Sequence, residues 1–290
     1  MSVKGVIMSE IIVGVSTAEQ AGLHAVRWAA RRASTRRARL HIVHVIDAAV
    51  EAKRDAQLMA AAKAEAQGVI DAAVAAANEV DPTLEVVTSF EHGPATEVFD
   101  ELSRNADLLV VGSDWHGGRR PSRRGVHSLR IAAGSRVPVA VIPDIDVAGR
   151  RGVVVGVDGS ESSSGTLEFA ASEAERLGEP LIAVHAWDIG VIVGAEYGYG
   201  VSMVDDGDLT TAARELLDTA LKPLVAAHPN LEIDRRVVIG DPVVALSDAA
   251  DEASLLVVGS HGRGALARFL LGSVSHGMLA HLEGPTVVVR

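Results

Sequence analysis

Short apolar runs rich in valine and isoleucine alternate with longer, alanine-rich stretches along the chain. In the second half, the runs with the length and composition of strands are 153–157, 181–186, 235–239, 254–258 and 286–289. Helices are predicted near 209–227, 242–252 and 272–282. The spacing of Leu167, Ala170, Ala174 and Leu177 predicts a further helix with one apolar face. The strand runs are continuously apolar, which is typical of parallel sheets covered on both faces.

This pattern occurs twice. IIVGVST at 11–17 matches VVVGVDG at 153–159, and DLLVVGS at 107–113 matches SLLVVGS at 254–260. The runs HIVHVID and VPVAVI of the first half match IAVHAWD and GPTVVV of the second, in the same order. Strand–helix alternation of this kind predicts a doubly wound, Rossmann-like α/β layer in each copy. We therefore predict two tandem domains, 8–145 and 151–290, joined around Pro143–Gly152.

Two strand ends of the second copy carry polar and glycine residues. The first strand ends in Asp158-Gly159-Ser160 and the fourth in Gly259-Ser260-His261-Gly262. In doubly wound sheets, ligands bind outside the carboxyl ends of the strands. Glycines allow close approach of a ligand to the backbone, and Gly272-Ser273 begins a helix whose free N–H groups suit a phosphate. The alternative is a flexible loop followed by an ordinary Ser-capped helix.

The spacing G-x-x-G-x9-G-[S/T] falls on Gly259, Gly262, Gly272 and Ser273. It resembles the nucleotide motif of the ATP-binding branch of the universal stress proteins, whose domains are adenine nucleotide alpha hydrolase-like. The resemblance extends to VGVDGS at 155–160, VHA at 184–186 and the closing VVV strand, and so covers both copies. It implies an ATP site at Gly156, Val157, Asp158, Gly159, Ala186, Val258, Gly259, Ser260, Gly262, Gly272, Ser273 and Val274.

The resemblance also implies roles for these residues. Asp158 would lie on the adenosine side, and the backbone of Ala186 would contact the adenine. Mg²⁺ would be held through the ATP phosphates, near Asp158, with no direct protein ligand set. For Asp158 the alternative is an Asx turn before Gly159. The glycine-rich loop around Tyr197 and Tyr199 could cover the adenine or be an ordinary connection.

The first copy departs from the motif. Ser16 replaces Asp158, Trp115 replaces Gly262 and Val126 replaces Ser273, whereas Gly112 and Gly125 are kept. An indole in place of a glycine would fill the pocket, so we predict little or no ATP binding in this half. The same loop carries Arg119, Arg120, Arg123 and Arg124, which are either solvated or contact an anion or protein.

Composition limits the remaining functions. The net charge is −11, which argues against general nucleic-acid binding. Residues 1–149 carry 17 Lys and Arg against 18 Asp and Glu, a net charge of −1, whereas residues 150–290 carry 10 against 20, a net charge of −10. The absence of cysteine excludes thiol chemistry, and no apolar stretch is long enough to span a membrane. With no signal-peptide pattern at the N-terminus, we expect a cytoplasmic protein.

Other nucleotide and metal motifs fit poorly. Gly262–Ala267 imitates a dinucleotide fingerprint, but no strand ending in an acid follows at the required distance. The P-loop is absent, and neither His41 with His44 nor His276 with His281 has metal-ligand spacing. Two hypotheses remain: an ATP-binding regulatory protein of the stress response, or a slow ATPase or nucleotide-activating enzyme. The former is favoured because the sequence offers no convincing catalytic base: no Lys follows the glycines, and Asp158 is the only carboxylate placed at the pocket. We also expect the strands 138–142 and 286–289 to pair within the chain. The helix faces left over would then join two chains in a homodimer.

Overall fold

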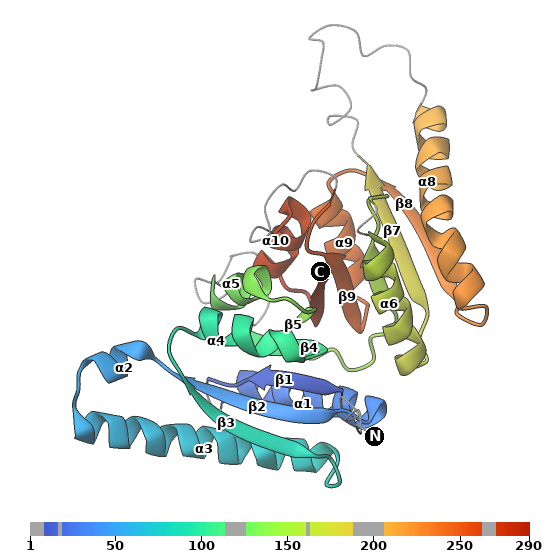
Figure 1. Cartoon of the computed structure of the whole chain (residues 1–290). Coiled ribbons are helices and arrows are strands. Elements are labelled where there is room, and N and C mark those ends of the chain that lie inside the picture. Colours follow the sequence, from blue (N-terminus) through green and yellow to red (C-terminus); the bar gives the residue numbers. More distant parts are fainter. Residues whose placement is uncertain (1–8, 17–18, 114–125, 161–162, 188–205, 263–270) are drawn as a thin grey trace, which may run out of the picture. The chain divides into compact units, whose positions relative to one another are not determined.

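A computed structural model of the chain describes residues 9–16, 19–113, 126–160, 163–187, 206–262 and 271–290 (Figure 1). The chain divides into two compact units, Met1–Ile145 and Asp146–Arg290. Within the described ranges, none of the helices combines the length and the hydropathy that crossing a membrane requires.

The first unit is a five-stranded parallel sheet with helices on both faces. Its strands are β1 (Glu10–Gly14), β2 (Arg39–Ile46), β3 (Val86–His92), β4 (Leu108–Ser113) and β5 (Val139–Pro143), in the spatial order β3-β2-β1-β4-β5. Its helices are α1 (Gln20–Arg36), α2 (Ala48–Ala52), α3 (Ala56–Val80), α4 (Ala95–Leu102), the short η1 (Ser103–Asn105) and α5 (Val126–Gly134). Helices α1 and α3 pack together on one face, and α4 and α5 pack together on the other.

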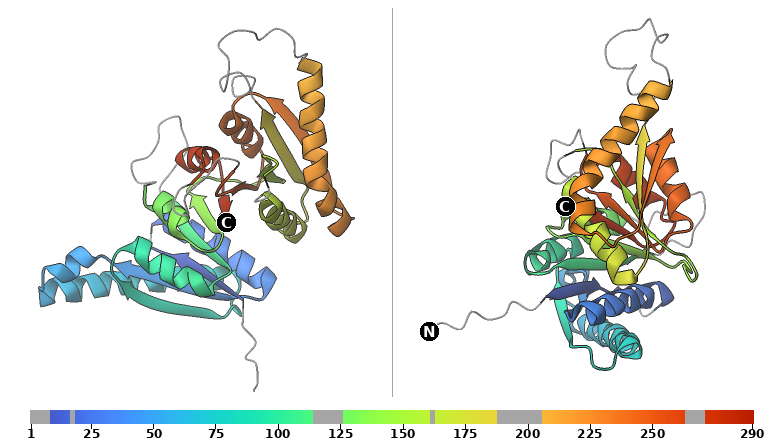
Figure 2. Two further views of the ribbon diagram at one scale, coloured as in Figure 1. Left: turned by 45° about the horizontal axis from the view of Figure 1, so that its top comes forward. Right: turned by 90° about the vertical axis from the view of Figure 1, so that its right-hand side faces the viewer.

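The second unit repeats this arrangement. Its strands are β6 (Val153–Gly156), β7 (Leu181–Trp187), β8 (Ile233–Ile239), β9 (Leu255–Gly259) and β10 (Thr286–Val289), in the order β8-β7-β6-β9-β10. Its helices are α6 (Ser163–Leu177), α8 (Asp206–Ala227), α9 (Pro242–Ala250) and α10 (Ser273–Ala280). Figures 1 and 2 show α6 and α8 on one face of this sheet and α9 and α10 on the other. Each half is therefore the doubly wound α/β layer that its strand–helix alternation predicts.

The central strands of the second unit form its core. Val153, Val154 and Val155 of β6 are fully buried, as is Val257 of β9. Burial of such side chains contributes roughly 1.5–3 kcal/mol each, before the entropic cost of ordering the chain is subtracted. Strand β8 is different, because it has a neighbour on one side only and exposes Asp234, Arg235 and Arg236.

Helix α6 largely follows the predicted apolar face. Leu167, Ala170 and Ala174 are buried, whereas Leu177 is 36% exposed. Leu177 is the last residue of the helix, and Gly178 after it adopts a left-handed conformation (φ +66°), which ends the helix. Arg37 (φ 53°) occupies the same left-handed position after α1 in the first unit.

Candidate functional site

The carboxyl ends of β6, β7 and β9 meet at one edge of the second sheet. Register pairs Val153 of β6 with Leu181 of β7 and with Leu255 of β9, all in parallel. Asp158 follows β6 by two residues, and the Gly259–Gly262 segment begins at the last residue of β9. This is the edge at which the sequence places a ligand.

Asp158 lies against the glycine segment. A Cβ built on Gly262 would lie 2.5 Å from Oδ2 of Asp158, closer than real Cβ contacts permit. Gly262 does not adopt a left-handed φ, so the close approach of Asp158, and not the backbone conformation, is what favours glycine here. The fold therefore brings together two residues that the sequence singles out separately.

The other carboxylate oxygen of Asp158 shapes its own turn. Oδ1 accepts hydrogen bonds from the backbone N–H of Ser160 at 2.9 Å and from the Ser160 hydroxyl at 2.7 Å. Gly159, between them, has a φ of +73°, a conformation that glycine adopts without strain. The Asx-turn alternative is thus present in the structure, together with the placement of Oδ2 beside Gly262.

The N-terminus of α10 adjoins the same loop. The backbone N–H of Gly272 donates to the carbonyl of Ser260 at 2.8 Å, and the buried Ser275 hydroxyl donates to the Gly272 carbonyl at 3.0 Å. Gly272 is the N-cap residue, with extended backbone, and no described side chain caps the helix there. The amide groups of the first turn therefore retain the positive dipole end that favours an anion, and Ser273 is exposed beside them.

Several residues outside the predicted set hold this edge in place. The Thr166 hydroxyl of α6 would lie 3.2 Å from a Cβ on Gly259, and Leu246 of α9 would lie 3.1 Å from a Cβ on Gly156. Thr166 and Leu246 are both buried. Nothing in the local sequence marks Thr166 or Leu246, because each packs against a segment distant from it along the chain.

Histidines bridge strand ends in both units. Nδ1 of His185, which is buried, lies 2.7 Å from the carbonyl oxygen of Val157, so Nδ1 carries the proton and donates it to this bond. In the first unit Nδ1 of His44 makes the equivalent 2.9 Å bond to Val15. Burial lowers the pKa of His44, against the opposing effect of its backbone bond. Ala186 follows His185, is half-buried and pairs in register with Val238.

Some of the remaining residues that the sequence singles out are described by the structure, and others are not. Val157 and Val258 are buried, Ser260 is buried with its hydroxyl 2.9 Å from Nδ1 of His261, and Val274 is half-buried in the first turn of α10. The Tyr197–Tyr199 loop, Trp115, Gly125 and the four arginines of the first copy lie outside the described residues. Ser16 is exposed, Gly112 is half-buried near the end of β4, and Val126 begins α5. Among the described residues, no group of three His, Asp or Glu has metal-binding geometry.

Comparison with known proteins agrees with this architecture. The sequence model of the Universal stress protein family matches residues 8–143 and again residues 149–290. A universal stress protein of Mycolicibacterium smegmatis is 31% identical over 290 residues, covering 97% of this chain and 96% of the relative. A universal stress protein of Mycobacterium tuberculosis is 29% identical over 302 residues, covering 97% of this chain and 94% of the relative.

A solved structure extends the likeness to three dimensions. The crystal structure of a universal stress protein from Archaeoglobus fulgidus matches with a TM-score of 0.71, covering 97% of this chain and 98% of that one. The identity is 18%, so this likeness shows the fold alone.

Each half of the chain is thus a Rossmann-like domain with five parallel strands. The chain belongs to the universal stress protein family and carries two of its domains in tandem.

Proposed function

We propose that the second unit binds ATP at the edge formed by Asp158, Gly259–Gly262 and the N-terminus of α10, and that nucleotide occupancy gives the protein a regulatory role in the stress response. The observation that carries the proposal is the contact between Asp158 and Gly262 beside an N-terminal helix cap that has no side chain. The Asp158 carboxylate, the glycine backbone and the positive end of the α10 dipole therefore lie at the same edge of the sheet.

The residues present fit the parts of ATP. The amide groups of the first turn of α10 and the exposed Ser273 hydroxyl supply donors for phosphate oxygens. Gly262 and Gly272 present backbone without a Cβ, which allows phosphates or ribose to approach closely. The turn around Asp158 places a carboxylate where it can accept hydrogen bonds from ribose hydroxyls.

Mg²⁺ would be held mainly by the phosphates, in keeping with its preference for keeping several waters and binding few protein carboxylates. Asp158 is the carboxylate beside Gly262 that could accept from a water on this ion. The bound ion would neutralise part of the triphosphate charge, which a unit as acidic as this one requires.

The test is titration calorimetry of the full chain with ATP and Mg²⁺. We expect about one equivalent per chain, because Ser16 and Val126 in the first copy lack the carboxylate and the hydroxyl of the second. Ser16→Ala should leave the titration unchanged, as the matched control for Asp158. Two equivalents would show that the first unit also binds ATP. If neither heat nor competition is detected at millimolar ATP, the site itself is rejected.

Binding is favoured over turnover because Oδ1 of the site carboxylate is engaged in its turn. Steady-state hydrolysis should therefore stay well below about 1 s⁻¹, the lower end of typical enzyme turnover. A rate at or above this value would favour the enzymatic alternative.

A further inference from the structure

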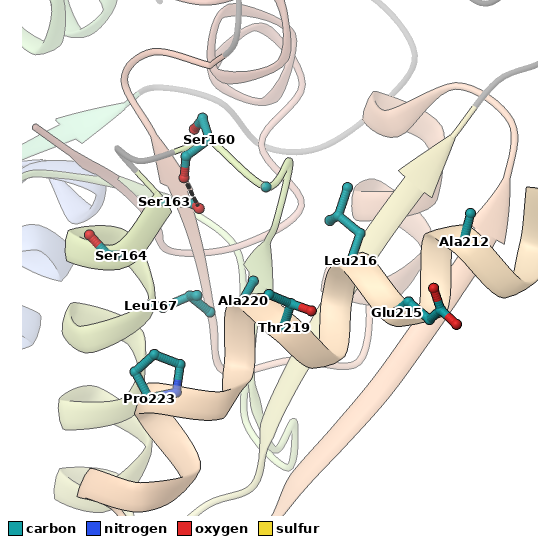
Figure 3. A pocket seen from close by; sticks show the side chains of 11 residues that line it. Ser160, Ser163, Ser164, Leu167, Ala212, Glu215, Leu216, Thr219, Ala220 and Pro223 are labelled. Atoms are coloured by element: carbon teal, nitrogen blue, oxygen red, sulfur yellow. Dashed lines mark hydrogen bonds between the residues drawn. The ribbon is translucent and has the colours of Figure 1, made fainter.

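The second unit contains a cavity on the face of its sheet, between α6 and α8. Its volume is about 500 Å³, within the range of roughly 300–1,000 Å³ of small-molecule sites. Figure 3 shows the turn before α6 and the first half of that helix on one side, and α8 on the other. The lining residues used in the argument are Ser160, Ser163, Leu167, Glu215, Thr219 and Pro223.

This cavity adjoins the proposed nucleotide site. The two share the Gly159–Ser160 turn, but the described lining contains no residue of the Gly259–Gly262 segment or of α10. The Ser163 hydroxyl donates to the carbonyl of Ser160 (Figure 3), which fixes the rim that the two sites share. A ligand of the cavity would therefore lie beside a nucleotide and not in its place.

The α8 wall offers hydrogen-bond acceptors. Glu215, Thr219 and Pro223 are spaced four residues apart, so they lie along one face of the helix. Pro223 has no N–H, and the Thr219 carbonyl, four residues earlier, consequently lacks its usual helical donor. The wall thus combines an exposed carboxylate with a backbone carbonyl that has no helical donor, and both can accept hydrogen bonds from a ligand.

The charge and the remaining surface define the ligand further. Among the described lining residues none is Lys, Arg or His, so an anionic group would meet no compensating cation. Residues 150–290 carry a net charge of −10, which attracts cations. Leu167 and Ala220 face each other across the cavity and, with Leu216 and Pro223, give it an apolar floor.

We propose that this cavity is a second ligand site, for a small organic ammonium compound with a short aliphatic body. The ammonium donates to Glu215, and the aliphatic chain covers Leu167 and Leu216. Charge-assisted hydrogen bonds of this kind are about twice as strong as neutral ones.

Three probes with a similar aliphatic body separate the contribution of the ammonium group from that of the apolar contact. They are hexylamine, hexanol and hexanoate, each used at neutral pH. Each is titrated into the full-length protein and followed by amide chemical shifts. Hexylamine should bind saturably and shift residues of α6 and α8, whereas hexanol should bind at least about fivefold more weakly and hexanoate not at all. Equal responses to all three probes, or no response to hexylamine, would overturn the proposal.

Variants locate the site. Glu215→Gln keeps the shape of the side chain and removes its charge, so it should weaken hexylamine at least about fivefold. Ala220→Phe should abolish binding of all probes by filling the cavity. Glu232→Gln, an exposed acid that does not line the cavity, should bind hexylamine like the unaltered chain. If Glu215→Gln and Glu232→Gln bind alike, the ammonium site is wrong.

The same variants keep this proposal distinct from ATP binding. Glu215→Gln should retain the ATP titration of the unaltered chain, because Glu215 lines only the α6–α8 cavity. Loss of hexylamine binding with intact ATP binding therefore supports this inference alone. Loss of ATP binding in Glu215→Gln would show that the two sites are one, which also overturns the proposal.

Discussion

Asp158 uses its two carboxylate oxygens for different purposes. One holds the turn to Ser160, and the other faces Gly262. Both functions require an acceptor at the same position, so the structural and the ligand-binding interpretations of this residue do not exclude each other.

Two substitutions at Asp158 separate the functions. Asp158→Asn keeps an oxygen that can accept from Ser160, whereas Asp158→Ala removes it. If the second oxygen contacts ribose or a magnesium-bound water, both variants should weaken ATP binding by about tenfold or more, about 1.4 kcal/mol. Calorimetry in which Asp158→Asn binds like the unaltered chain would restrict the residue to its turn.

A substitution at Gly262 tests the close approach of this residue to Asp158. In Gly262→Ala the new methyl would lie 2.5 Å from Oδ2 of Asp158, so the carboxylate or the loop must move. ATP binding should weaken by about tenfold or more, with little change in thermal stability. Gly165→Ala is the matched control, since a Cβ there meets no described atom within 4 Å and alanine favours the helix. Equal ATP affinity in both variants would place the nucleotide elsewhere.

At the scale of elements, α6 and α8 are joined at the end opposite the cavity by a histidine and two glutamates. His228 follows α8, with Nδ1 2.9 Å from Glu175 and Nε2 3.2 Å from Glu168, both on α6. The hydrogen bond to Glu175 is the main cause that raises the pKa of His228, with Glu168 acting in the same direction against desolvation.

The raised pKa predicts a pH-dependent stability. The folded state favours protonated His228, so this contribution is fully present below the unfolded pKa of 6.5 and is lost as pH rises through the higher folded value. The contribution of His228 to the unfolding free energy should therefore decrease as pH rises above 6.5, by less than about 1 kcal/mol because both glutamates are about half exposed.

Urea denaturation of His228→Gln measures this effect. The variant should lose part of the pH slope shown by the unaltered chain, whereas His276→Gln, at an exposed position of α10, should retain it. Identical slopes in the unaltered chain and His228→Gln would show that the ion pairs contribute nothing measurable.

At the scale of the whole molecule, two units with one strand order differ in charge and in their site residues. The second unit retains the complete motif, and the first has Ser16 and Val126 at the corresponding positions. The two units therefore share their arrangement of buried strands and differ in residues that follow the strand ends.

We predict that the full-length chain forms a homodimer. Light scattering at micromolar concentration should report about twice the chain mass of 30.2 kDa. The physical reason is that exposed helix faces can associate through self-complementary surfaces. A strict monomer over the accessible concentration range would reject this prediction, and ATP titrations on the same samples would remain interpretable.

The sequence by itself determined the fold, the tandem repeat and the position of the candidate site. Strand runs such as 153–157 and 254–258 are continuously apolar because both faces of the sheet are covered, and this signal is local in the chain. The glycine spacing from Gly259 to Ser273 is local as well. These features could therefore be predicted without coordinates, whereas the turn that Asp158 makes with Ser160 was only the alternative interpretation of that residue.

The tertiary structure alone decided how distant segments meet. The approach of Gly262 to Asp158, the packing of Thr166 against Gly259 and the cavity between α6 and α8 each join residues from separate elements. The exposure of Leu177 and of the charged residues in β8 depends on where an element lies in the unit, which periodicity does not encode. Contacts of this kind are set by packing of the whole unit, so no local pattern specifies them.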